Sequence, residues 1–160
     1  MSGDRKHRPE VPLACTLRVH AMCRYRPGPA AIRQDARMAS ERETLRSLLI
    51  AYSARYAVSL PEVQNQIEHR FPGMSPEDRH HLAVDLIDEL VADGVIALFG
   101  FVNSGEPIEY GQRSNTRLRT DEAWLPGDDP GDHVAATTLG EAMAAVLPDE
   151  LWLEWEYPAG

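Results

Sequence analysis

Carboxylates and imidazoles recur along one side of a predicted helix between Ser75 and Gly94. Asp78, His81 and Asp85 are spaced three and four residues apart, which places them along one helical face. A histidine and an acid one turn apart can transfer a proton or bind a metal ion, so acid–base or metal chemistry would lie here. Two further metal ligands are not evident, however, and a solvated polar face is the simpler interpretation.

Other catalytic signatures are missing from the sequence. It contains no nucleophile elbow, no Gly-rich phosphate loop, no His-Glu-x-x-His motif and no Cys-x-x-Cys pair. We therefore expect a noncatalytic protein that uses no cofactor.

Three arginines form the one basic cluster in an otherwise acidic region, at Arg113, Arg117 and Arg119. Their guanidinium groups could bind phosphate oxygens or partner carboxylates through two hydrogen bonds each. The alternative is pairing within the chain, with nearby acids at Glu106, Glu109, Asp121 or Glu122. If nucleic acid binds, this segment is the first place to look.

The C-terminal tail, residues 148–160, combines aromatic and acidic side chains. Large apolar residues alternate along it, at Leu151, Leu153, Trp155 and Tyr157. This pattern predicts an edge strand or an apolar row that packs across the first helix or the strands. The alternative is a docking or dimerisation segment, because aromatic anchors dominate protein interfaces.

Capping signals predict where the helices that position these groups begin. A Ser or Thr followed three residues later by an acid occurs at Ser40, Ser59, Ser75 and Thr138. Apolar residues at helical spacing follow each of these caps. We expect the second helix to end at residues 72–73, the third to leave through Gly94, and the last to stop at Pro148.

Two strands are expected between the third helix and the last one. Residues 95–102 are β-branched and aromatic and are bounded by turn residues, which predicts a strand. Its expected partner is 133–137. The thirty residues between them, 103–132, are far more than a hairpin needs, and 120–125 could form one helical turn.

Length and composition indicate one folded domain with tails. The chain has 160 residues, 43% of them hydrophobic, which suffices for one sizeable core. Residues 1–37 are rich in Arg, Pro and Ala and predict a disordered basic arm before a domain at 38–147. Alternatively, Met38 is the real translation start and the upstream part is a leader.

Charge and cysteine content limit the cellular compartment and the classes of partner that we expect. The net charge is −9, and residues 41–160 hold eight basic against twenty-two acidic residues. Such a surface disfavours nonspecific binding to nucleic acid or to an anionic membrane. With only Cys15 and Cys23, and no window long enough to span a bilayer, we expect a cytoplasmic protein without a membrane partner.

Two segments carry a family resemblance. Residues 86–96, Leu-Ile-Asp-Glu-Leu-Val-Ala-Asp-Gly-Val-Ile, resemble the end of the third helix in bacterial winged-helix proteins, where Leu-x-x-Asp-Gly-hydrophobic leads into the first wing strand. Residues 138–142, Thr-Leu-Gly-Glu-Ala, resemble the Thr-x-x-Gly segment that follows the second wing strand in many of their transcription regulators. The long wing makes the pattern most similar to uncharacterised actinobacterial winged-helix proteins.

The resemblance covers about residues 40–147 and implies an α+β winged helix-turn-helix fold. This fold has three helices and a β-wing, here with a long wing insertion, a short C-terminal helix and an aromatic tail. Winged helices serve DNA reading, protein docking and RNA-polymerase assembly alike, so the resemblance is weaker for function than for fold.

In such a fold the third helix would enter the major groove of DNA. Its outward residues do not suit that task, because Arg79 is the only Lys or Arg between Ser75 and Gly94. We therefore expect a regulatory module that docks a protein partner. Three carboxylates would select a basic partner, at Asp85, Asp88 and Glu89. Three aromatic side chains would supply apolar contact, at Trp152, Trp155 and Tyr157.

The alternative is a DNA-binding transcription regulator that contacts phosphates through wing arginines. The residues concerned are Arg113, Arg117 and Arg119, which in a protein-docking module would instead orient the wing. Such a regulator could act as a homodimer whose basic arms assist.

Overall fold

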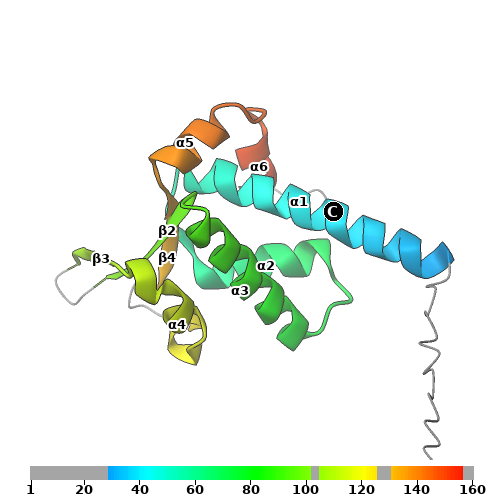
Figure 1. Cartoon of the computed structure of the whole chain (residues 1–160), viewed down its shortest axis with the longest axis horizontal. Coiled ribbons are helices and arrows are strands. Elements are labelled where there is room, and N and C mark those ends of the chain that lie inside the picture. The colour runs from blue at the N-terminus through cyan, green and yellow to red at the C-terminus, as the bar shows by residue number, and fades with distance from the viewer. Residues whose placement is uncertain (1–28, 102–104, 126–130, 157–160) are drawn as a thin grey trace, which may run out of the picture.

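The computed structural model describes residues 29–101, 105–125 and 131–156 (Figure 1). The first 28 residues of the predicted basic arm lie outside the described residues, as does Tyr157. Within them the chain forms six α-helices and a four-stranded antiparallel sheet, which confirms the predicted α+β class.

Helix α1, Pro29–Ser53, crosses the middle of the molecule, with α5 and α6 above it and α2 and α3 below (Figure 1). Leu45, Leu48 and Leu49 on this helix are fully buried, as their spacing predicts. The predicted start at Ser40 is wrong, because the helix begins at Pro29. Proline is well tolerated in the first turn of a helix, and alanines and arginines follow it, so the helix extends into the predicted arm.

Helices α2, Leu60–Arg70, and α3, Pro76–Ala92, begin after the serines that the sequence indicates. The hydroxyl of Ser75 accepts a hydrogen bond from the Asp78 amide at 3.1 Å and donates to its carboxylate at 2.7 Å. Ser59 also stands at an N-cap but makes no side-chain cap bond. The two helices therefore start where predicted, although only one start uses its hydroxyl.

The sheet contains both predicted strands and two further short ones. Its strands are β1 Val58–Ser59, β2 Ile96–Phe101, β3 Pro107–Glu109 and β4 His133–Ala136. Their order is β1-β4-β2-β3. Ile96 lies opposite Ala136 and Phe99 opposite His133, so the expected long-range strand pair is confirmed.

The described part of the connection between β2 and β4 is folded rather than an open loop. After β3 it forms a 3-10 turn at Gly111–Arg113, helix α4 at Ser114–Leu118 and a second turn, η2, at Asp121–Trp124. The predicted helical turn near residues 120–125 is thus confirmed, whereas α4 and β3 were not predicted. Leu118 is fully buried, and Trp124 donates from Nε1 to its carbonyl oxygen at 2.8 Å. These two side chains extend the core.

The N-cap of helix α5, Thr138–Ala144, lies one residue earlier than the sequence suggests. Thr137, not Thr138, is the N-cap: its hydroxyl accepts from the Gly140 amide at 3.3 Å and donates to the Gly94 carbonyl at 2.6 Å. The Thr137 hydroxyl therefore joins the end of α3 to the start of α5, a contact that no capping pattern reveals.

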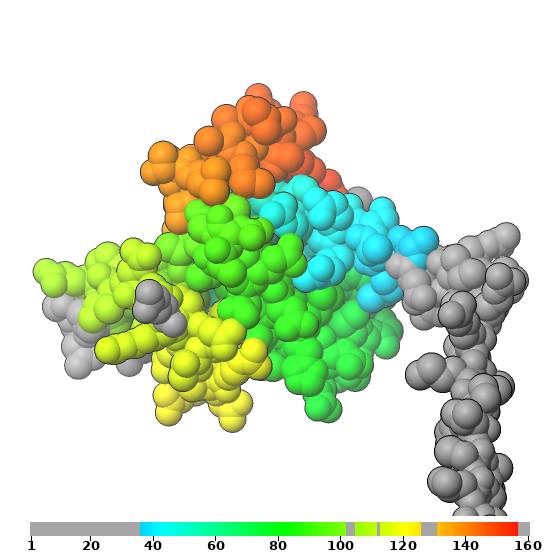
Figure 2. Space-filling view, in the orientation of Figure 1, coloured from blue at the N-terminus to red at the C-terminus, as the bar shows by residue number. Residues whose placement is uncertain are grey.

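The tail forms helix α6, Leu151–Glu156, so the prediction of an extended strand is wrong there. Trp155 is 1% exposed and stacks on Tyr52 of α1 at a centroid separation of 5.4 Å. The expected packing on the first helix is correct, but a helix places Trp155 inward and Trp152 toward the end of α1. Figure 2 shows α5 and α6 as a ridge over α1.

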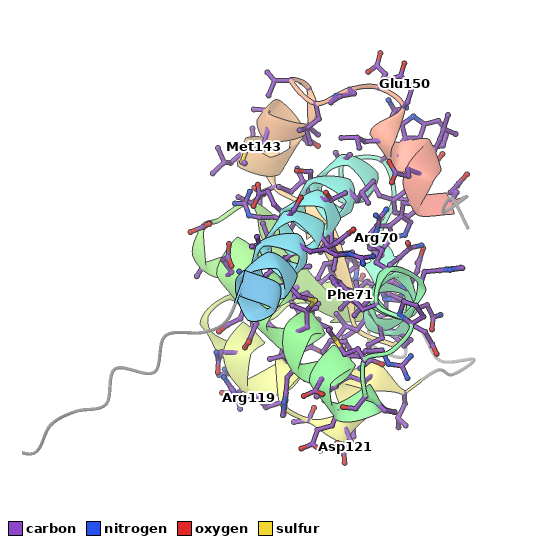
Figure 3. The ribbon with its side chains drawn as sticks, turned by 90° about the vertical axis from the view of Figure 1, so that its right-hand side faces the viewer. Arg70, Phe71, Arg119, Asp121, Met143 and Glu150 are labelled. Atoms are coloured by element: carbon purple, nitrogen blue, oxygen red, sulfur yellow. The ribbon has the colours of Figure 1, made fainter. Side chains whose placement is uncertain are left out.

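Helix α6 is also bound to α2 by a stripe of polar side chains spaced four residues apart. Glu62 accepts from Trp155 Nε1 at 2.9 Å, Gln66 donates to the Trp155 carbonyl at 2.5 Å, and Arg70 pairs with Glu154 at 2.9 Å. Arg70 lies in the middle of the molecule in Figure 3. We call this set of contacts the α2–α6 seam.

Gly140→Ala should destabilise the protein by about 1–3 kcal/mol, although alanine usually favours a helix. A Cβ at this position would overlap the backbone oxygen of Val95, which cannot move without distorting the sheet. Gly73→Ala is the matched control, because nothing lies within 4 Å of its Cβ, and a gain of about 0.4–1 kcal/mol is expected. Urea unfolding measures both, and equal effects would contradict this packing.

Candidate functional site

The outer face of α3 is negatively charged. Glu77, Asp78 and Asp85 are exposed, together with His81. Arg79, the only Lys or Arg in this helix, pairs with Glu68 of α2 at 2.6 Å and is 18% exposed. The carboxylates that α3 presents to solvent are therefore not offset by a cation of the same helix.

The three carboxylates expected to select a basic partner have different surroundings. Asp85 is exposed. Asp88 accepts a hydrogen bond from Asn115 of α4 at 2.6 Å, and Glu89 pairs with Arg42 of α1 at 2.7 Å. Only Asp85 thus faces solvent fully, while the other two also hold neighbouring helices against α3.

The histidines of α3 have separate surroundings. The His80 ring lies 2.9 Å from the Gln64 amide nitrogen and meets the edge of Trp124 at a centroid separation of 4.7 Å. His81 is exposed near Asp85. In the part of the chain that the structure describes, no group of three or more His, Cys, Asp or Glu residues is arranged to hold a metal ion.

One of the three wing arginines is bound to a buried carboxylate. Asp132 is only 3% exposed and accepts hydrogen bonds from Arg117 Nε and from the Tyr110 hydroxyl, the latter at 2.8 Å. Arg117 also pairs with Glu122 at 3.3 Å, one of the acids that the sequence suggests. Asp132 itself was missed, because it follows an acidic Gly-Pro segment that predicts only a break.

Burial and hydrogen bonding shift the pKa values of Tyr110 and Arg117 in this cluster. Burial, and then the hydrogen bond to Asp132, raise the pKa of Tyr110, while the same carboxylate raises the pKa of Arg117. Gly100 leaves room for the cluster: a Cβ there would overlap the Tyr110 hydroxyl and lie 2.8 Å from Asp132 Oδ1. The neutral phenol and the charged guanidinium together hold α4 against the sheet.

The other two wing arginines are exposed. Arg119 Nε donates to Asn115 at 3.0 Å, so it is partly held by α4, and Arg113 ends the preceding 3-10 turn. The predicted basic cluster therefore divides into one arginine with a structural role and two that reach solvent.

The aromatic residues expected at a partner interface are also divided. Trp155 belongs to the core, which removes it as a surface anchor. Trp152 is partly buried, with the Arg55 guanidinium 4.9 Å from its ring centroid. Tyr56, 47% exposed, lies 6.4 Å from Trp152. Of the predicted trio, Trp152 thus lies beside the exposed Tyr56 and Arg55, and Tyr157 lies outside the described residues.

The predicted site residues form two separate surfaces rather than one. Arg119 and Asp121 lie at one end of the molecule in Figure 3, and Glu150 lies at the opposite end, beyond α1. Asp88 of α3 contacts Asn115 of α4, whereas Trp152 follows Glu150 by two residues in the chain.

Comparisons with known proteins add no relative. No family model matches the sequence, and neither the curated proteins nor the solved structures contain a significant match. None of the helices in the described ranges combines the length and apolar character needed to cross a membrane. The surfaces of the chain are therefore the basis for assigning its function.

Arg117→Ala should cost about 3 kcal/mol of unfolding free energy, because it leaves the buried Asp132 carboxylate without its cation. Arg113→Ala is the control, since this side chain is exposed and a change within about 0.5 kcal/mol is expected. Chemical unfolding followed by circular dichroism compares the two. Similar losses for both variants would show that the Asp132 pair does not hold α4.

The Tyr110 phenol should make stability depend on alkaline pH. Its raised pKa means that folding favours the protonated form, so its contribution is complete below pH 10 and is lost as pH rises through the folded value. Tyr110→Phe should cost about 1–2 kcal/mol at pH 7 and lose stability less steeply above pH 10 than the parent protein. Urea titrations from pH 7 to 11 measure this, and parallel profiles would exclude it.

Proposed function

We propose that this chain is a noncatalytic winged-helix regulatory module that docks a protein partner. The order of its elements supports the fold: α1, the short strand β1, α2 and α3 precede the antiparallel pair of β2 and β4. Strand β1 pairs with the outer edge of β4. Residues 103–132 are then an enlarged wing, whose described part contains β3, α4 and η2.

The charge on α3 is the observation that carries the choice of a protein partner. In a winged helix that reads DNA, α3 would lie among phosphates, where Glu77, Asp78 and Asp85 would each be repelled. Its single arginine is already paired with Glu68. A basic protein surface complements such a face, and opposite charges increase both the rate and the specificity of encounter.

The packing of the enlarged wing supports the same choice. Asn115 of α4 binds Asp88, and Trp124 of η2 packs on His80, so the wing lies along one flank of α3. One helix with its side chains is about 10–12 Å wide and fills a major groove of about 12 Å. The wing residues beside α3 therefore narrow the face that this helix could present to a groove.

The two exposed wing arginines support an alternative, a regulator that binds DNA through the wing. Arg113 and Arg119 could contact phosphates without placing α3 in a groove. Two such contacts predict a weak, salt-sensitive association, with the logarithm of affinity falling by about 0.9 per contact for each logarithmic unit of salt.

Protein docking through α3 is tested by purifying the untagged chain from its own cells and identifying what stays bound. We expect a polypeptide, and we expect charge reversal by Glu77→Lys and Asp85→Lys to weaken its binding at least about tenfold. Glu106→Lys is the matched control, an exposed acid near β3 that is expected to retain the partner.

Recovery of duplex DNA that is lost on replacing Arg113 and Arg119 with Ala would instead establish the alternative. Partner binding that survives both α3 reversals would exclude α3 as the docking face.

A further inference from the structure

A hollow of about 200 Å³ lies between the end of α1 and the turn that joins α5 to α6. Four small side chains line it, and we call these the alanine floor: Ala51, Ala54, Ala144 and Ala145. Trp152 and Pro148 form walls, and the remaining lining residues are charged. Figure 2 shows the ridge of α5 and α6 that bounds it above α1.

The size of the hollow suits one side chain rather than a small-molecule ligand. Small-molecule pockets usually have volumes of about 300–1,000 Å³, which is larger than this one. Alanines leave an apolar floor without projecting atoms, and the indole of Trp152 adds a flat wall. Such a surface can cover the methylene stem of a long side chain.

The charged groups at the hollow are two carboxylates and one guanidinium. Glu141 and Asp149 are exposed, and neither takes part in an ion pair among the described residues. Arg55 is placed over the Trp152 ring instead of against a carboxylate. The hollow therefore offers two acceptors to an incoming cation and keeps its own cation engaged on the aromatic wall.

We propose that this hollow binds a lysine or arginine side chain of the protein partner. The methylene stem lies on the alanine floor beside Trp152, and the cationic end lies at Glu141 and Asp149. This inference rests on the proposed function, because it assumes a protein partner. Trp, Tyr and Arg are the residues that most often dominate binding energy, and Trp152, Tyr56 and Arg55 adjoin the hollow.

The test titrates the full-length protein with Nα-acetyl-lysine methylamide and with its uncharged norleucine analogue. Nuclear magnetic resonance follows the Trp152 indole N–H and the alanine methyl groups of the floor. We expect saturable shifts with the lysine probe and binding at least about fivefold weaker with norleucine, because only the former carries a cation.

Two sets of variants locate the binding. Glu141→Gln with Asp149→Asn should weaken the lysine probe about fivefold or more, whereas Glu150→Gln, an exposed acid outside the lining, should not. Ala145→Leu should block the hollow and abolish the shifts, because the larger leucine side chain would occupy part of its volume. Ala145 is exposed, so the substitution buries no charged group.

Absence of saturable shifts, equal binding of norleucine, or binding that survives both sets of variants would overturn the proposal. The probe needs no native partner. A negative result with the probe therefore excludes the lysine or arginine site alone. Failure to recover a polypeptide that depends on the α3 carboxylates would instead exclude the docking function.

Discussion

The buried carboxylate of Asp132 is the constraint on which the shape of the wing depends. It lies just before β4 and meets side chains from the segment after β3 and from α4. A charge removed from water must be matched by hydrogen bonds and a counter-ion, and Tyr110 and Arg117 provide both. Because Gly100 of β2 has no side chain, it leaves room for the Tyr110 hydroxyl and the Asp132 carboxylate. A long connection is thereby held as a folded layer beside α3.

The domain carries acidic side chains on two separate surfaces. On one side, the wing covers a flank of α3 and leaves Asp85 facing solvent. On the other, α5 and α6 pack on α1 and leave the hollow beside Trp152. Helix α1 separates the two sides (Figure 1). The wing thus determines how much of the acidic face of α3 is open to solvent.

The periodicity of the sequence was enough to predict the elements that hold the core. Helices α2 and α3 and the pairing of β2 with β4 follow from apolar spacing, caps and β-branched residues. Helix α4 could not be predicted, since five residues with two inward side chains carry no usable period. The role of Asp132 depends on partners fifteen and twenty-two residues away, which no local pattern encodes.

The tail shows how alternation can mislead. Apolar residues at every second position predict a strand, yet α6 buries Trp155 and packs Leu151, four residues earlier, against the same core. A tryptophan alone buries a large area. Polar partners on α2 then complete its contacts. The sequence contains those partners, but the stripe of Glu62, Gln66 and Arg70 is read as a solvated face until α6 is placed on it.

The α2–α6 seam has a consequence for the order in which the molecule forms during synthesis. The hydrogen bond from Trp155 to Glu62 spans 93 positions, and the one to Gln66 spans 89. Until α6 has been synthesised, the side chains of Glu62 and Gln66 lack these partners, and the Tyr52 ring lacks the indole that stacks on it. We therefore expect folding during synthesis to finish only with the last residues of α6, and intermediates without α6 to expose these groups.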